Sequence, residues 1–147
     1  MKQRSIRIGE VLVLEGLITA DQLVLALKIQ KETGDFLGDV LVKRKWISEN
    51  QLSTALSQQF DIPFCSLDFD QIDWSVPQHY PSLIAEQNCF PIAHDSSSVT
   101  VAISNPLDAW TMSQVELQSR GRDVKLVLAT KTQIRAVIDE LRKRSLR

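Results

Sequence analysis

The feature that most constrains this chain is a stretch of 24 residues that occurs twice. Residues 7–30 read RIGEVLVLEGLITADQLVLALKIQ, and residues 36–59 read FLGDVLVKRKWISENQLSTALSQQ. The two copies align without gaps at an offset of 29 residues, and ten of the 24 paired positions are identical. A spacer of five residues, 31–35, separates them. Since an internal repeat marks one structural unit that is used again, we expect the two copies to fold alike.

Each copy begins with the pattern of a short helix. Gly9 and Gly38 are each followed by an acidic residue and then by an apolar run. An acidic side chain in the first helical turn complements the helix dipole. We therefore expect a short helix that opens at each glycine.

A longer helix is predicted to follow a turn in each copy. Thr19 and Gln22 form one capping box, and Ser48 and Gln51 form the other, with the hydroxyl and the amide each accepting a backbone N–H. Apolar residues and a final Gln then recur at the spacing i, i+3, i+4, i+7, which predicts one face of an amphipathic helix. The residues on this face are Leu23, Ala26, Leu27 and Gln30 in the first copy and Leu52, Ala55, Leu56 and Gln59 in the second.

These patterns allow two interpretations. Leucine and valine at helical spacing usually form a core, so the copies could be two helical hairpins packed into a small four-helix unit. That interpretation leaves the opening glycines and the closing glutamines unexplained. A glycine permits close approach to the backbone, helix N-termini bind phosphate, and a glutamine offers both donors and an acceptor. Two similar copies would suit the two halves of a two-fold symmetric ligand.

The doubled stretch resembles the MshEN domain, the N-terminal module of type II secretion and type IV pilus assembly ATPases. That family carries two 24-residue motifs, five residues apart, which together bind cyclic di-GMP. The motif runs Arg-Leu-Gly, two apolar residues, a Gly with two more apolar residues, two Leu and a final Gln. The first copy has every element, with one conservative change: Arg7-Ile8-Gly9, Leu12-Val13, Gly16-Leu17-Ile18, Leu23, Leu27 and Gln30.

The second copy departs from this motif at three positions. Phe36 stands in place of Arg, Lys45 in place of Gly and Trp46 in place of Leu. The resemblance implies that the leading Arg contacts a guanine of the ligand, where its planar guanidinium can stack and donate hydrogen bonds. Phe36 can stack but cannot donate, and Lys45 could reach a phosphate or simply be solvated. The first half of the site is therefore expected to be intact and the second altered.

The resemblance implies a set of ligand-binding residues in both copies. In it apolar side chains line the ligand, the backbone at the two glycines approaches it, and the two glutamines add polar contacts. The expected set is Arg7, Ile8, Gly9, Leu12, Val13, Leu23, Leu27, Gln30, Leu37, Gly38, Leu41, Val42, Leu52, Leu56 and Gln59.

Composition excludes several other classes. Charged residues make up 24% of the chain and the formal net charge is −1, so no overall field favours a nucleic acid polymer or a membrane surface. No apolar run is long enough for a membrane span, and the N-terminus lacks the apolar segment of a signal peptide. Cys65 and Cys89 are too few for a disulfide framework, so we expect buried, reduced thiols in a cytoplasmic protein.

The second half of the chain reads as a mixture of strands and helices. We expect a short strand over 64–67, a loop over 68–81 and a short helix over 81–87. A hairpin is predicted over 89–103, a helix over 107–120 closed by Gly121 and a strand over 124–128. The last predicted helix, 132–144, has Ile134, Val137, Ile138 and Leu141 on one face. The predicted fold class is α+β, with a helical tandem-repeat part at 1–60 and a small α/β part at 61–147.

This half also resembles the MshEN family, through the phrase Val-x-Val-Ala-x-x-Asn-Pro-x-Asp at 99–108. Taken by itself, Asn105-Pro106 is a turn after a strand, and no ligand is assigned to it.

The sequence shows no catalytic constellation. No glycine is followed by lysine, so a Walker A loop is absent from this chain. His79 and His94 have no Cys or carboxylate at metal-ligand spacing, and Ser96–Ser98 lack the context of a nucleophile. We therefore expect no enzymatic activity, no metal and no cofactor.

We expect a cytoplasmic regulatory domain that binds cyclic di-GMP, as part of an assembly ATPase or as a stand-alone relative. Expected partners are a C-terminal ATPase domain or a secretion or pilus platform protein. The alternative is an interaction adaptor that keeps the repeat as architecture, has lost the nucleotide and docks onto such a platform, with Phe36, Lys45 and Trp46 facing the partner or packing. A third possibility is an ATPase fragment with neither role.

Overall fold

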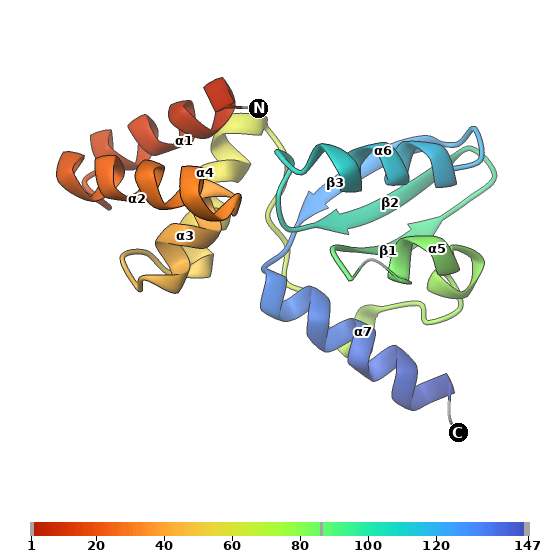
Figure 1. Cartoon of the computed structure of the whole chain (residues 1–147). Helices are drawn as coiled ribbons and strands as arrows, with labels where there is room; N and C mark the ends of the chain where they lie inside the picture. Colours follow the sequence, from red (N-terminus) through yellow and green to blue (C-terminus); the bar gives the residue numbers. More distant parts are fainter. Residues whose placement is uncertain (1, 86, 146–147) are drawn as a thin grey trace. The chain divides into compact units, whose positions relative to one another are not determined.

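The computed structural model describes residues 2–85 and 87–145, with side chains from residue 7 onward (Figure 1). The chain divides into two compact units, Met1–Asp61 and Ile62–Arg147. The first unit is helical and carries both copies of the repeat, whereas the second combines helices with a sheet. The predicted α+β fold class is therefore confirmed.

Four helices make up the first unit. They are α1 (Lys2–Leu14), α2 (Ala20–Thr33), α3 (Leu37–Lys43) and α4 (Glu49–Phe60). Helix α1 packs against α2, α3 and α4, and α3 packs against α2 and α4. Exchanging the two copies converts the α1–α4 contact into the α3–α2 contact, so the packing has approximate two-fold symmetry. Side chains from both copies share one core: Ile8, Leu12, Ile18, Ala26, Leu37, Val40, Leu41, Ile47, Ala55 and Leu56.

Both predicted capping boxes are present. At the start of α2, Thr19 N donates to Gln22 Oε1 (2.8 Å) and Gln22 N donates to Thr19 Oγ1 (3.1 Å). At the start of α4, Ser48 N donates to Gln51 Oε1 (2.9 Å) and Gln51 N donates to Ser48 Oγ (3.0 Å). Each box satisfies two backbone N–H groups that a helix start would otherwise leave without partners.

The predicted start of the first helix is wrong. Helix α1 begins at Lys2, so Gly9 and Glu10 lie in its interior, whereas α3 begins at Leu37 with Gly38 and Asp39 in its first turn. Interior N–H groups of a helix already bond to carbonyls, so the backbone at Gly9 is not a free helix N-terminus. Gly9 instead leaves space for a side chain of another helix.

A three-stranded sheet forms the centre of the second unit. Strands β1 (Cys89–His94) and β2 (Ser98–Ile103) pair antiparallel, with an irregularity between Pro91 and Ala93. Strand β3 (Asp123–Leu128) lies on the other side of β2 and runs parallel to it, so the order is β1-β2-β3. Helix α6 (Ala109–Gln118), capped by Asp108, provides the crossover that a parallel pair needs.

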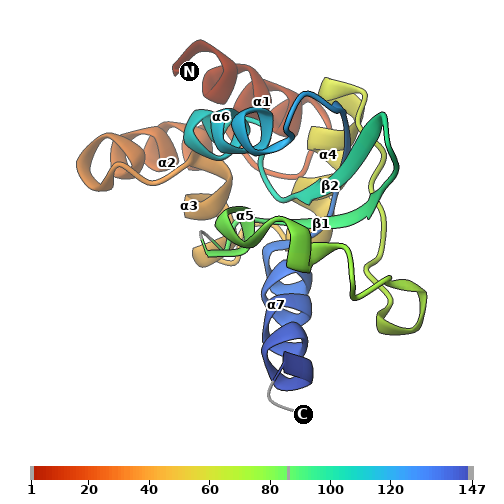
Figure 2. The same ribbon diagram turned by 90° about the vertical axis from the view of Figure 1, so that its right-hand side faces the viewer.

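Both faces of this sheet are covered. Phe90 and Ala102 pack with four residues of α7 (Lys131–Ser145), which are Ile134, Val137, Ile138 and Leu141. These four are the residues predicted to share the apolar face of the last helix. On β2, alternate side chains point to opposite faces, and Val99, Val101 and Ile103 are buried on the face away from α7. Figure 2 shows α6 on the opposite side of the sheet from α7, with α5 (Pro81–Ala85) beside β1.

Several predicted elements of the second unit differ in extent. The strand expected at 64–67 is reduced to one parallel bridge between Phe64 and Leu128, where Cys65 N donates to Leu128 O and Leu128 N donates to Pro63 O. The loop over 68–81 contains two 3₁₀ turns, η1 (Phe69–Gln71) and η2 (Pro77–His79). Helix α6 ends at Gln118, before the left-handed Gly121 that was expected to close it.

Two further expectations concern single features. Cys89 is buried as predicted, whereas Cys65 is only half-buried, and the two cysteines form no disulfide in the described part of the chain. Across the described ranges 2–85 and 87–145, no helix has the length and apolarity needed to cross a membrane.

Candidate ligand-binding site

The two copies fold alike at the turn that joins their helices. In the first copy, Gly16 N donates to Val13 O (3.0 Å) and Leu17 N donates to Leu12 O (3.0 Å). In the second copy, the equivalent amides 45 and 46 donate to carbonyls 42 and 41, at 2.9 Å and 3.1 Å. Residues 16 and 45 both adopt the left-handed conformation, with φ of 75° and 61°. The turn is thus the same structure in both copies, although Lys45 replaces a glycine.

The motif glycines also play the same part in both copies. A Cβ atom at Gly9 would overlap a Cδ atom of Leu23 and lie 3.2 Å from Leu37. A Cβ atom at Gly38 would lie 2.7 Å and 2.9 Å from the two Cδ atoms of Leu52. Each glycine therefore lets the leucine at the fourth position of the second helix of its own copy lie directly against the first helix. The group that each glycine admits is this leucine, which fixes the position of Leu23 and Leu52.

Accessibility divides the fifteen expected ligand-binding residues into two sets. Six are buried and form the scaffold of the unit: Ile8, Gly9, Leu12, Leu37, Leu41 and Leu56. Nine are half-buried or exposed and can touch a ligand: Arg7, Val13, Leu23, Leu27, Gln30, Gly38, Val42, Leu52 and Gln59. We call Arg7, Val13, Leu23, Leu27 and Gln30 the first half-site. The second half-site consists of Phe36, Val42, Leu52 and Gln59.

The closing glutamine of the second copy, Gln59, has a side-chain oxygen without a hydrogen-bond donor. Gln59 Oε1 is buried and accepts no hydrogen bond, although the residue is only half-buried. A buried acceptor without a donor costs about 1–3 kcal/mol, so such atoms are few in native proteins. A donor supplied by a ligand would remove this cost. Gln30, its counterpart, is half-buried as well.

The opening residues of the two half-sites differ in chemistry and in backbone. Arg7 lies within α1, its side chain is exposed, and no ion pair or hydrogen bond holds it within the described part of the chain. Phe36 is half-buried and precedes α3 with an extended backbone (φ −67°, ψ 145°). The equivalence that holds at the turns and at the glycines therefore does not extend to positions 7 and 36.

Basic residues gather at the C-terminal end of α3. Lys43 Nζ lies 3.3 Å from Asp35 Oδ2, and the guanidinium of Arg44 lies 5.9 Å from the centre of the Trp46 ring. Lys45 is exposed between them. Cations at a helix C-terminus complement its dipole, which gives this group a structural role. The Arg44–Trp46 contact was not predicted, although an Arg two residues before a Trp was visible in the sequence.

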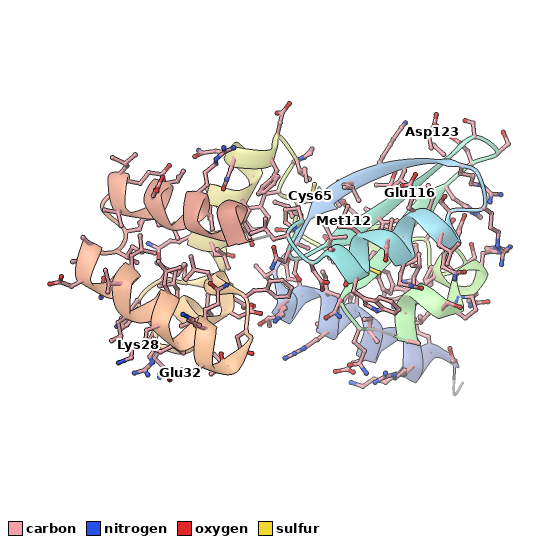
Figure 3. All side chains as sticks on the ribbon, turned by 45° about the horizontal axis from the view of Figure 1, so that its top comes forward. Lys28, Glu32, Cys65, Met112, Glu116 and Asp123 are labelled. Carbon is pink, nitrogen blue, oxygen red and sulfur yellow. The ribbon has the colours of Figure 1, made fainter. Side chains whose placement is uncertain are left out.

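Three exposed apolar side chains of the first copy were also missed. Leu14, Val24 and Leu25 are 86%, 68% and 43% exposed. Their counterparts in the second copy are Lys43, Ser53 and Thr54, so comparing the copies position by position would have revealed the difference. Figure 3 shows the charged residues Lys28 and Glu32 on α2, the helix that also carries Val24 and Leu25.

The second unit offers a small aromatic and histidine cluster rather than a metal site. Tyr80 Oη lies 3.1 Å from His94 Nδ1, and the rings of His79 and His94 are 5.0 Å apart. No group of three or more His, Cys, Asp or Glu side chains is placed to hold a metal among residues 2–85 and 87–145.

Comparison with known proteins identifies the family. A family model for the MshEN domain matches residues 60–147, which is more than half of the chain. The chain belongs to the MshEN domain family. This match covers the second unit, so the tandem copies add to the evidence independently. The predicted resemblance to the family is confirmed.

Relatives of this MshEN domain are assembly ATPases. The chain is 31% identical over 135 residues to the type IV pilus assembly ATPase PilB of Myxococcus xanthus, covering 90% of this chain and 24% of that protein. It is 33% identical over 113 residues to PilB of Thermus thermophilus, covering 75% of this chain and 13% of that protein. The chain therefore spans a quarter or less of the length of these two relatives.

Solved structures with the same fold include one bound state. The structure of MshE with cyclic di-GMP superposes with a TM-score of 0.79 at 29% identity, covering 91% of this chain and 97% of that one. The N-terminal domain of XpsE superposes with a TM-score of 0.72 at 19% identity, covering 91% of this chain and 92% of that one. The latter likeness concerns the fold alone. Both matches extend over the two units of this MshEN domain.

Proposed function

We propose that this MshEN domain binds cyclic di-GMP through its two half-sites and reports the nucleotide to an assembly ATPase on the cytoplasmic side of the membrane. The observation that carries this proposal is the matched pair of glycine–leucine contacts, Gly9 with Leu23 and Gly38 with Leu52. These contacts place one apolar side chain of each copy in equivalent positions. A ligand with two identical halves is the natural occupant of two equivalent surfaces. The structural likeness to MshE with cyclic di-GMP supports the same ligand.

Each half-site supplies a different kind of contact. The half-buried Val13, Leu23 and Leu27 present apolar surface to the flat faces of bases and to riboses. Arg7 provides the donors and the charge that guanine and phosphate require. Gln59 Oε1, which lacks a donor, can accept from a ribose hydroxyl. The six buried residues of the motif hold these groups in place without touching the ligand.

The direct test is isothermal titration of the chain with cyclic di-GMP, with GMP as the control ligand. Saturable binding near one ligand per chain, absent for GMP, is the expected result. Arg7→Ala should weaken binding with no loss of thermal stability, because its side chain is exposed and contacts no partner among the described residues. Arg135→Ala, which removes an exposed Arg from α7, is the matched control and should leave binding unchanged. If Arg7→Ala binds like the parent chain, the role given to Arg7 is wrong.

A second candidate function, protein docking, is favoured by one observation. Leu14, Val24 and Leu25 expose apolar side chains where the second copy has Lys43, Ser53 and Thr54. A pilus or secretion platform protein, or a C-terminal ATPase domain, would bury such side chains. A photo-crosslinking residue at position 24 should capture the partner in cells, whereas the same residue at position 54 should not. Equal capture at both positions would contradict a docking role for this surface.

A further inference from the structure

The two copies differ in the opening residue of each half-site, which is Arg7 in the first and Phe36 in the second. Elsewhere the copies match in turn geometry, in capping boxes and in the glycine–leucine contacts. At position 7 the first copy has an arginine on helical backbone, with no partner among the described residues. At position 36 the second copy has a phenylalanine on extended backbone. A ligand that spans both half-sites therefore meets two different recognition surfaces.

Arg7 can read a guanine. The O6 and N7 atoms of guanine are two adjacent acceptors, and a guanidinium donates to both at once. Adenine presents a donor, its N6 amino group, where guanine has O6, so the same contact repels it. Because Arg7 is exposed and has no partner in the described part of the chain, it is available for this contact.

Phe36 cannot make that distinction. Its side chain has no donor or acceptor, makes no hydrogen bond at the start of α3 and has no ring or cation partner among the described residues. An aromatic ring stacks on any base, because every base has a π face. A base that lies against Phe36 is therefore held by its face rather than identified by its edge.

We propose that the second half-site does not read the base, so that this chain accepts a hybrid guanine–adenine cyclic dinucleotide about as well as cyclic di-GMP. The guanine takes the Arg7 end and the adenine takes the Phe36 end. This inference rests on the proposed function, because it requires that a cyclic dinucleotide occupies both half-sites. It extends that function from one ligand to a class, defined by one guanine and one unspecified base.

The affinities of three ligands test the proposal on the unmodified chain. The hybrid, 3′,3′-cyclic GMP–AMP, should bind within about threefold of cyclic di-GMP, and about twofold weaker is expected because only one of its two orientations is productive. Cyclic di-AMP should bind about tenfold or more weakly, because it presents no guanine to Arg7 and one bidentate arginine–guanine pair discriminates by this order. Isothermal titration gives all three dissociation constants.

Two exchanges between the half-sites sharpen the test. Phe36→Arg should let the second half-site distinguish guanine from adenine, so that the hybrid binds about tenfold more weakly than cyclic di-GMP. Arg7→Phe should abolish this discrimination in the first half-site and bring the affinity for cyclic di-AMP close to that for cyclic di-GMP. Phe64→Arg, at an aromatic residue outside both copies, is the matched control and should leave the ratio of the hybrid to cyclic di-GMP unchanged. Melting temperatures show whether each variant is folded.

The outcomes separate this inference from the proposed function. If cyclic di-GMP binds but the hybrid binds tenfold or more weakly to the unmodified chain, the second half-site does read guanine and the inference is overturned. If no cyclic dinucleotide binds, the proposed function itself is wrong and the inference falls with it. The ratio measured on the unmodified chain decides the matter even if a variant fails to fold.

Discussion

Some residues in this protein adopt backbone conformations that the neighbouring sequence does not predict. Lys45 adopts the left-handed conformation that Gly16 adopts at the same place in the first copy. For a side chain other than glycine this conformation costs about 1–2 kcal/mol, since Cβ approaches the backbone oxygen. The second copy tolerates this cost because the hydrogen bonds of the turn are retained. Alignment of the two copies, rather than the local sequence around Lys45, is what locates this strain.

Exchanging the residues at this turn should shift stability in opposite directions. Lys45→Gly should raise the free energy of unfolding by about 1 kcal/mol, because it removes the left-handed penalty. Gly16→Lys should lower it by about the same amount, because a Cβ atom added at Gly16 would meet no other described residue within 4 Å and only the backbone conformation opposes the change. Urea unfolding of both variants measures the shifts. A loss of stability in Lys45→Gly would mean that the lysine side chain makes a stabilising contact.

Asp95 holds the turn between β1 and β2 through its carboxylate. The backbone N–H groups of Ser97 (2.8 Å) and Ser98 (2.7 Å) donate to Asp95 Oδ1, and both serine hydroxyls add to them. These hydrogen bonds lower the pKa of Asp95 from 3.8 to about 2. The folded state binds this proton less readily than the unfolded state, so the stabilisation is present above pH 3.8 and is lost as the pH falls towards 2.

Asp95→Ala tests this pH dependence. The variant should be less stable than the parent chain at neutral pH, and the difference should shrink as the pH falls through the window from about 4 to 2. Thermal unfolding at a series of pH values follows both proteins. Asp70→Ala, which removes an exposed carboxylate from η1, is the control. A stability difference that persists unchanged at pH 2 would show that charge on Asp95 does not stabilise the turn.

At the scale of the element, each half-site depends on how its second helix lies against its first. Leu23 and Leu52 occupy the space that Gly9 and Gly38 leave, and both leucines remain half-buried. The helical spacing of these residues was readable from the sequence. The partner of each glycine was not, because Gly9 and Leu23 are fourteen positions apart and only the packed hairpin brings them together. The expectation that a glycine opens the first helix of each copy was wrong for Gly9, because α1 begins at Lys2.

Charge introduced at these leucines should abolish binding. Leu23→Asp and Leu52→Asp should each weaken cyclic di-GMP binding about tenfold or more, because a desolvated carboxylate opposes both bases and phosphates. Leu25→Asp, on the more exposed side of α2, is the matched control and should bind normally. Titration gives the affinities, and circular dichroism shows whether helix content is kept. Binding that survives in both variants would place the ligand elsewhere.

At the scale of the whole molecule, the two units differ in what they contribute to the family match. The MshEN family model matches residues 60–147, yet all fifteen expected ligand-binding residues lie in the first unit, Met1–Asp61. The proposed function therefore assigns the nucleotide to the unit that lies almost entirely outside the matched residues. The matched unit supplies the sheet and the core around α7.

Ligand binding should stabilise the chain unevenly. At about 100 times its dissociation constant, cyclic di-GMP should add roughly 2.7 kcal/mol to the unfolding free energy of the part that binds it. Hydrogen exchange measured by mass spectrometry should show new protection in peptides from residues 7–59, and GMP should produce none. Protection confined to peptides from residues 62–147 would contradict a site built from the two copies.

The sequence by itself determined the repeat, both capping boxes, the apolar face of α7 and the α+β class, because these depend on local periodicity and on hydrogen bonds between near neighbours. Only the tertiary structure decided that α1 extends back to Lys2, that 64–67 makes a single bridge and that Gly9 admits Leu23. It also decided which motif residues are buried and which remain accessible. Burial depends on which surfaces meet when helices distant in sequence pack together, and no local pattern of apolar residues contains that information.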